Sequence, residues 1–148
     1  MRSILVLFVT IFILSVSWVY GQTSSETILE IKVTGIQTSK GMIAVGINDS
    51  SEGWPRKPQY EYEWDKEGLQ DSILVLKVSG LKYGTYAISA LDDENSNEEL
   101  DLLKRERFGF SGNPVLRFSP PKFEECSFSI ESRITHVEIS MKNRGKQK

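Results

Sequence analysis

The chain has 148 residues, with 18 Lys and Arg against 20 Asp and Glu and a formal net charge of −2 at pH 7. This nearly balanced composition argues against nucleic acid as a partner, because proteins that bind it present a clear excess of basic charge. The chain contains one Cys and one His, which excludes an intrachain disulfide and gives no support to nucleophilic catalysis by a Cys–His pair. We expect a protein that is not an enzyme.

The N-terminus has the pattern of a secretory signal peptide. Arg2 precedes an apolar run that extends from residue 4 to residue 19. A retained anchor is the alternative, but the run is shorter than the roughly 20 residues that a membrane-spanning helix needs. We expect cleavage after Gly21, so residues 1–21 are the predicted signal peptide. The mature protein is then secreted or periplasmic and has no membrane span.

The rest of the chain is predicted to form one β-sandwich domain over residues 22–142, followed by a disordered basic tail over residues 143–148. The mature length lies in the commonest size range for a single domain. A short polar segment at a chain end usually frays, and we prefer this interpretation of the tail to membrane or nucleic-acid binding.

Apolar residues alternate with polar ones along most of the mature chain, and no segment carries a helical stripe over ten or more positions. Residues 29–33 and 43–47 are two predicted strands, which we expect to form a hairpin across the turn at residues 35–41. Four further strands are predicted at residues 72–78, 85–91, 127–131 and 135–141. The fold class is therefore all-β, an antiparallel β-sandwich of about seven strands.

The first of two long predicted connections, residues 48–71, concentrates aromatic side chains beside acidic ones. Trp54, Tyr60, Tyr62 and Trp64 lie within eleven residues. Such a group is a candidate platform on which sugar rings stack. Because the last three keep the period of a strand, we prefer the alternative in which they cover the core.

The second connection opens with an acidic loop, residues 92–101, in which nine of ten side chains carry oxygen. Asp93, Asn95, Asn97, Glu99 and Asp101 alternate along it. Alternating carboxylates and amides can wrap oxygens around calcium, with Glu99 offering its carbonyl. Such a site would be structural and weak, with a dissociation constant of about 0.1 to 1 mM. The alternative is a solvated turn without metal, which the same residue types favour.

Cys126 and His136 have simple structural interpretations. Cys126 lies among apolar residues, so we expect a buried, inert thiol rather than a reactive one. His136 alternates with the apolar residues of its predicted strand, so we expect it on the exposed face.

Several segments together resemble one bacterial family of exported proteins. They are Gly84-Thr85-Tyr86-Ala87, Asp93-Glu94-Asn95-Ser96-Asn97 with Leu100-Asp101, Phe108-Gly109-Phe110-Ser111 and Pro120-Pro121-Lys122-Phe123-Glu124. In this order they resemble the family of domain of unknown function 2141, and the residues 34–41 and 49–55 are similar to its opening. The resemblance implies a small exported β-sandwich, immunoglobulin-like or transthyretin-like, with no assigned activity.

The acidic loop departs from the family pattern His-Asp-Glu-Asn-Gly-Asn-Gly-Lys-Leu-Asp. The departures are Asp92 for His, Ser96 and Glu98 for the two Gly, and Glu99 for Lys. Counted from Asp93, the sixth place of a calcium loop is Glu98 instead of Gly, and the twelfth is Lys104 instead of Glu. An EF-hand is therefore excluded, and any calcium site is a bare oxygen loop.

Our leading hypothesis is a non-catalytic binding or accessory module whose partner is an envelope protein or an extracellular glycan. The first alternative is a purely structural domain without metal that meets a partner protein by strand addition. The second is a carbohydrate-binding module that uses the aromatic segment 54–64. Hydrolysis of a glycoside by a carboxylate pair is a remote possibility, since no pair among the twenty acids is singled out.

Overall fold

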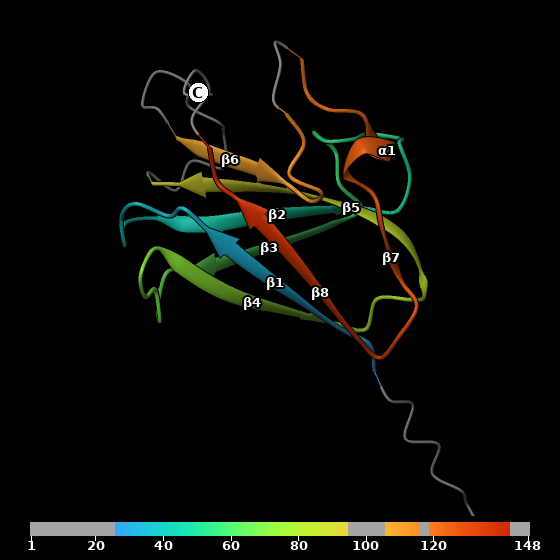
Figure 1. The fold of residues 1–148 in the computed structure, drawn as a ribbon, viewed down its shortest axis with the longest axis horizontal. Helices are drawn as coiled ribbons and strands as arrows, with labels where there is room; N and C mark the ends of the chain where they lie inside the picture. The colour runs from blue at the N-terminus through green and yellow to red at the C-terminus, as the bar shows by residue number, and fades with distance from the viewer. Residues whose placement is uncertain (1–25, 95–105, 116–118, 143–148) are drawn as a thin grey trace, which may run out of the picture.

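The computed structural model describes residues 26–94, 106–115 and 119–142, which form eight strands and one short helix (Figure 1). In chain order the elements are β1 (Ile28–Thr34), β2 (Met42–Asn48), β3 (Tyr60–Asp65), β4 (Ile73–Ser79), β5 (Gly84–Asp93), β6 (Arg107–Phe110), α1 (Phe123–Cys126), β7 (Phe128–Ile130) and β8 (Ile134–Ser140). The predicted signal peptide and the predicted tail lie outside the described residues. Within the described part, no helix has the length and apolar character that spanning a membrane requires.

Two sheets pack face to face with their strands crossing, which confirms the predicted all-β sandwich (Figure 1). One sheet has the order β4-β1-β8, and the other has the order β3-β2-β5-β6, with β7 paired to the start of β5. Every pair is antiparallel except β1 with β8, which is parallel. β7 pairs with β5, so the chain passes from one sheet to the other between β7 and β8. β8 then lies beside β1 and runs parallel to it. The immunoglobulin-like or transthyretin-like type of sandwich stays a prediction.

The core follows directly from the alternation in the sequence. In β1, Leu29, Ile31 and Val33 are buried, whereas Lys32 is exposed between them. The facing strand β2 buries its own alternate residues in the same way. Each such aliphatic side chain contributes about 1.5 to 3 kcal/mol when it leaves water, so the two inner faces hold the layers together.

The predicted hairpin of the first two strands is wrong, because β1 and β2 lie in different sheets. Their connection runs from one sheet to the other. It buries Ile36, whose N–H donates to the carbonyl of Ser72 at 3.2 Å. Gly35 begins the crossing with φ of +82°, a conformation that costs glycine little. The segment 35–41 is longer than most hairpin loops and long enough to span the roughly 10 Å between packed sheets.

Both predicted long connections contain regular structure that the sequence analysis did not assign. The first carries β3, which pairs with β2 so that Tyr62 lies opposite Val45. The second carries β6, which pairs with the end of β5, and the helix α1. Among the described residues, the loops that remain are the segment between β2 and β3, the segment between β3 and β4, and parts of the connection between β6 and α1.

One side of the sandwich is closed by contact between the two sheets. Phe108 of β6 and Lys142, just after β8, exchange two backbone hydrogen bonds of 3.2 and 2.9 Å. A Cβ on Gly109 would lie 2.6 Å from Cγ2 of Ile139, so only glycine permits this approach. The side chain of Asn113 bonds the outer edge of β8, accepting from the N–H of Ser140 at 2.7 Å.

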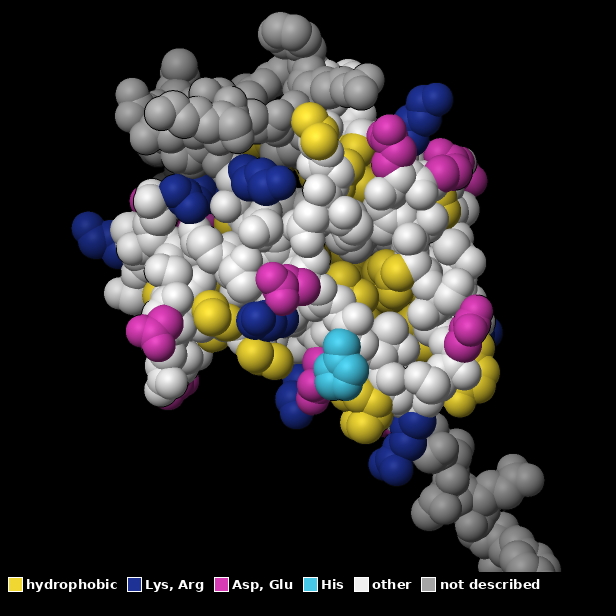
Figure 2. All heavy atoms as spheres, in the orientation of Figure 1, with side chains coloured by type: hydrophobic (Ala, Val, Ile, Leu, Met, Phe, Trp, Pro, Cys, Tyr) yellow, Lys and Arg dark blue, Asp and Glu magenta, His cyan; other side chains and the backbone are white. Residues whose placement is uncertain are grey.

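The outer face of the three-stranded sheet carries charged side chains in cross-strand pairs, with hydrophobic side chains among them (Figure 2). Glu30 on the central strand pairs with Lys77 at 2.9 Å and with His136 at 3.0 Å. Lys32 pairs with Glu138 at 3.1 Å. His136 is exposed, as predicted, and the three pairs are those of a solvent-facing sheet surface.

Candidate functional site: a trough between two connections

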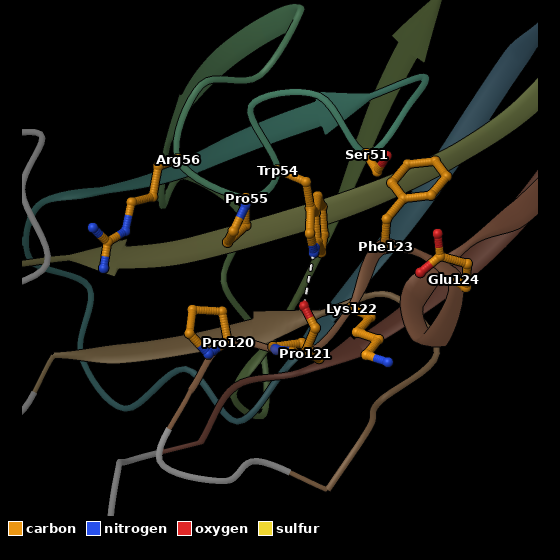
Figure 3. Close-up of a pocket in the computed structure, with 9 residues that line it drawn as sticks. All are labelled: Ser51, Trp54, Pro55, Arg56, Pro120, Pro121, Lys122, Phe123 and Glu124. Carbon is orange, nitrogen blue, oxygen red and sulfur yellow. Dashed lines mark hydrogen bonds between the residues drawn. The ribbon is translucent and has the colours of Figure 1, made fainter.

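An open trough lies where the connection between β2 and β3 meets the segment that leads into α1 (Figure 3). It has a volume of about 460 Å³. Its lining is Ser51, Trp54, Pro55, Arg56, Pro120, Pro121, Lys122, Phe123 and Glu124. Most of the apolar part is aromatic or proline, so the trough presents stiff, flat surfaces rather than flexible side chains.

Trp54 lies in the middle of the trough and joins its two walls. Its indole N–H donates to the carbonyl of Pro121 at 2.9 Å (Figure 3). Its ring meets Phe123 edge-on at a centroid distance of 6.0 Å and Phe110 at 5.7 Å. The hydrogen bond and the two ring contacts fix the orientation of the indole, and the side chain stays only partly buried.

The wall that carries Trp54 is held by a buried amide. Asn48, at the end of β2, has no solvent exposure, and its Nδ2 donates to the carbonyls of Glu52 and Lys57 at 3.4 and 3.3 Å. Gly53 has φ of +76°, and a Cβ there would lie 2.5 Å from the carbonyl oxygen of Lys57. The loop is therefore closed on itself and has a defined shape before any ligand is present.

The opposite wall rests on Ser111, which is completely buried. Its hydroxyl accepts from the N–H of Ile88 at 2.8 Å and donates to the carbonyl of Cys126 at 2.6 Å. These bonds tie α1 to the central strand β5. Phe110 and Cys126 form a second small core with Ala87 beneath the trough.

Charged side chains lie at the two ends of the trough. Figure 3 shows Arg56 at one end of the row and Lys122 with Glu124 at the other. All three are exposed. The arrangement offers an apolar strip between hydrogen-bonding groups, which is typical of sites for amphipathic ligands such as sugars.

The four aromatic residues predicted as a platform are divided between two places. Tyr62 and Trp64 stack on each other, with ring centroids 5.5 Å apart at 24°, and pack against the main core. Tyr60 is 37% exposed on the same strand. Trp54 belongs to the second core instead. No local sequence pattern indicates the partners of Trp54 in the trough, because the prolines at 120 and 121 come much later in the chain.

Of the predicted calcium ligands, the structure describes Asp93 alone, and Asn95, Asn97, Glu99 and Asp101 lie outside the described residues. Asp93 is the last residue of β5 and is 2% exposed. In the described part of the chain, no three His, Cys, Asp or Glu side chains are grouped so as to hold a metal ion. The metal hypothesis thus depends on residues beyond Asp93.

A buried cluster of charges lies at the start of the acidic loop, and no sequence pattern indicates it. Asp92 has no exposure and contacts the amine of Lys66, which is also buried. Arg107 lies opposite Asp92 in the β5–β6 pair and donates to the carbonyl of Gly35 at 2.6 Å. Burial raises the pKa of Asp92, and the contact with Lys66 opposes this effect.

Cys126 is buried, as predicted, at the end of α1. Burial raises the pKa of its thiol to about 12. A thiol of this kind is not a nucleophile near neutral pH, because the reactive species is the thiolate.

Comparison with known proteins gives one result. The model of the family described as "Uncharacterized protein conserved in bacteria (DUF2141)" matches residues 31–138. No curated protein matches, and no solved structure matches. The match runs from β1 into β8 and so spans both sheets and the trough. The chain therefore belongs to the bacterial DUF2141 family of uncharacterized proteins.

Proposed function

We propose that this protein is an exported, non-catalytic binding module that holds an extracellular glycan in the trough around Trp54. The observation that carries the proposal is the fixed indole, bonded to Pro121 and braced by two phenyl rings at a partly open surface. A sugar ring stacks on such a surface without having to order it first, so little conformational entropy is lost on binding.

The charges at the ends of the trough complement the aromatic strip. Arg56 and Lys122 are exposed donors on either side of Trp54. Arginine and lysine bind the hydroxyl and carboxylate oxygens of an acidic sugar. An acidic polysaccharide is therefore the first glycan to test, and a neutral one is its control.

The test is binding of purified mature protein to polygalacturonate, with dextran as the neutral probe. In the mature chain only Trp54 and Trp64 are tryptophans, so a Trp64→Phe background leaves Trp54 as the single fluorescent reporter. We expect saturable quenching with polygalacturonate. Trp54→Ala should weaken binding at least tenfold when measured by calorimetry, whereas Trp64→Phe should leave it unchanged, because Trp64 packs against the core.

Two outcomes contradict the proposal. Equal affinity of the Trp54→Ala variant and the unchanged protein shows that the trough is not the site. Absence of binding to both polysaccharides, and also to isolated peptidoglycan, shows that the protein is not a glycan-binding module. Export is tested separately, by N-terminal sequencing of the protein from the culture medium and the periplasm, where the first residue should be Gln22.

We also propose that the loop from Asp93 to Asp101 binds calcium weakly and that the ion stiffens the loop. Support comes from Asp93, which is held at the end of the central strand β5 and so gives the loop one fixed end. The loop contains the carboxylates of Asp93, Glu94, Glu98, Glu99 and Asp101. A divalent cation would offset the repulsion among them.

The second candidate function is a structural domain that binds a partner protein by strand addition. It is favoured by β4, which lies at the edge of its sheet and exposes 54% of Val75. The edge of β8 is less accessible because Asn113 bonds it. Here Val75→Lys should abolish retention by the isolated envelope fraction, and Trp54→Ala should leave it intact.

A further inference from the structure

Lys66 and Asp92 form a buried contact that links two strands that are not neighbours. Lys66 directly follows β3, and Asp92 is the second-last residue of β5, with β2 between these strands. Both side chains have no solvent exposure, and the Lys66 amine touches Oδ1 of Asp92. The Lys66 side chain therefore passes the start of β2 to reach the carboxyl group.

The contact does not have the features of a well-made ion pair. Among the described residues, neither carboxylate oxygen of Asp92 has a partner with hydrogen-bond geometry. The Lys66 amine donates instead to the carbonyl of Lys40. A buried pair of ions is stable only when hydrogen bonds satisfy its remaining lone pairs, since both groups have lost their water. The geometry thus places an amine against a carboxyl group without the usual compensation.

We propose that Lys66 and Asp92 are joined by an intramolecular isopeptide bond between Nζ and Cγ. One proton first moves from the ammonium to the carboxylate, which gives a neutral amine and a carboxylic acid. The nitrogen lone pair then attacks Cγ, the Nζ–Cγ bond forms, and one C–O bond breaks. The oxygen leaves with two hydrogens as water, and the product is a neutral secondary amide. The protons of the pair itself balance the reaction, so no oxidant, reductant or activating group is consumed.

The surroundings favour each part of this condensation. Arg107 lies opposite Asp92 in the β5–β6 pair, and a positive charge on this neighbouring residue favours the oxyanion of the tetrahedral intermediate. The amide keeps one N–H, which the carbonyl of Lys40 can still accept. Exclusion of water from both side chains protects the finished bond from hydrolysis.

The test is the mass of the purified protein under denaturing conditions. We expect a mass lower than that of the sequence by one water, about 18 Da. Lys66→Arg and Asp92→Ala should each restore the full mass of their sequences. The control is Lys32→Arg, because Lys32 forms an exposed ion pair with Glu138; this variant should still lack one water.

A tryptic digest locates the bond, because trypsin does not cleave after an acylated lysine. The expected product is a branched peptide that contains both Lys66 and Asp92. The proposal is overturned if the unchanged protein has the full mass of its sequence, or if trypsin cleaves completely after Lys66. It is also overturned if the missing water maps to other residues. The result does not depend on whether the variants fold, since the unchanged protein decides it.

Discussion

Ser111→Ala tests whether one hydroxyl holds the helix and the trough onto the central strand. The hydroxyl takes the place of a backbone partner at the end of the β5–β6 ladder, where it accepts from the N–H of Ile88 at 2.8 Å. It also donates to the carbonyl of Cys126 at 2.6 Å. All three residues have no solvent exposure, so water cannot replace the lost partner without entering the core.

The size of the effect follows from these two bonds. A buried hydrogen bond contributes about 1 kcal/mol, and a buried donor or acceptor left without a partner costs about 1 to 3 kcal/mol. Alanine removes both bonds and leaves the N–H of Ile88 unsatisfied. We expect the free energy of unfolding to fall by about 2 to 4 kcal/mol. For a domain of this size, that loss lowers Tm by about 10 °C.

The assay is urea unfolding of residues 22–148 followed by circular dichroism, with Ser129→Ala as the matched control. Ser129 lies on β7 and is exposed, so its substitution should change stability by no more than about 0.5 kcal/mol. If the two variants unfold at the same urea concentration, the buried hydroxyl does not carry the structural role described for it.

Three further predictions concern the acidic loop, the closed side of the sandwich and the buried thiol. Calcium at 5 mM should raise the free energy of unfolding by about 1 kcal/mol over excess chelator if the dissociation constant is near 1 mM, and Asp101→Ala should abolish that difference; equal melting with and without calcium refutes the metal site. Gly109→Ala should lower the free energy of unfolding in urea by about 1 to 3 kcal/mol, because its Cβ would lie 2.6 Å from Cγ2 of Ile139. The control is Gly84→Ala, where the nearest contact of a Cβ is an ordinary 3.6 Å. Equal losses of stability in the two variants would contradict the close approach at Gly109. Burial raises the pKa of Cys126 from 9.0 to about 12, so the folded state binds the thiol proton more tightly than the unfolded state does. The free energy of unfolding should therefore fall as pH rises above 9, by at most about 1.4 kcal/mol per pH unit. Cys126→Ala should lack this component, and parallel curves of stability against pH for the two proteins would refute the prediction.

The alternation of apolar and polar residues was sufficient to predict the fold class, because the apolar positions are the ones that a two-layer sandwich buries. It could not predict which strands pair. The inner face of β1 has the same pattern whether its neighbour is β2 or β8, and Gly35 to Gly41 looks like a turn in either arrangement. Only the length of that segment and the buried Ile36 distinguish a crossing from a hairpin, and the burial of Ile36 is a tertiary effect.

The candidate site could be predicted only in part for a similar reason. Trp54 stood out as an aromatic residue in a long connection, but its bond to Pro121 joins residues 67 apart in the sequence. Asp92 was predicted to begin the acidic loop, yet the structure places it in β5 and buries it beside Lys66. No local pattern marks Lys66, since a lysine after a strand is usually exposed.

The position of β1 has a consequence for the order in which the chain can fold. Its two neighbours are β4 and β8, and the pair of Thr34 with Ser140 joins residues 106 apart. A nascent chain that lacks β8 leaves one edge of β1 open and the core uncovered on that side. Completion of the three-stranded sheet therefore waits until β8 has been synthesised. Contacts of such long range form slowly, so the core stays open on that side during synthesis of the preceding strands.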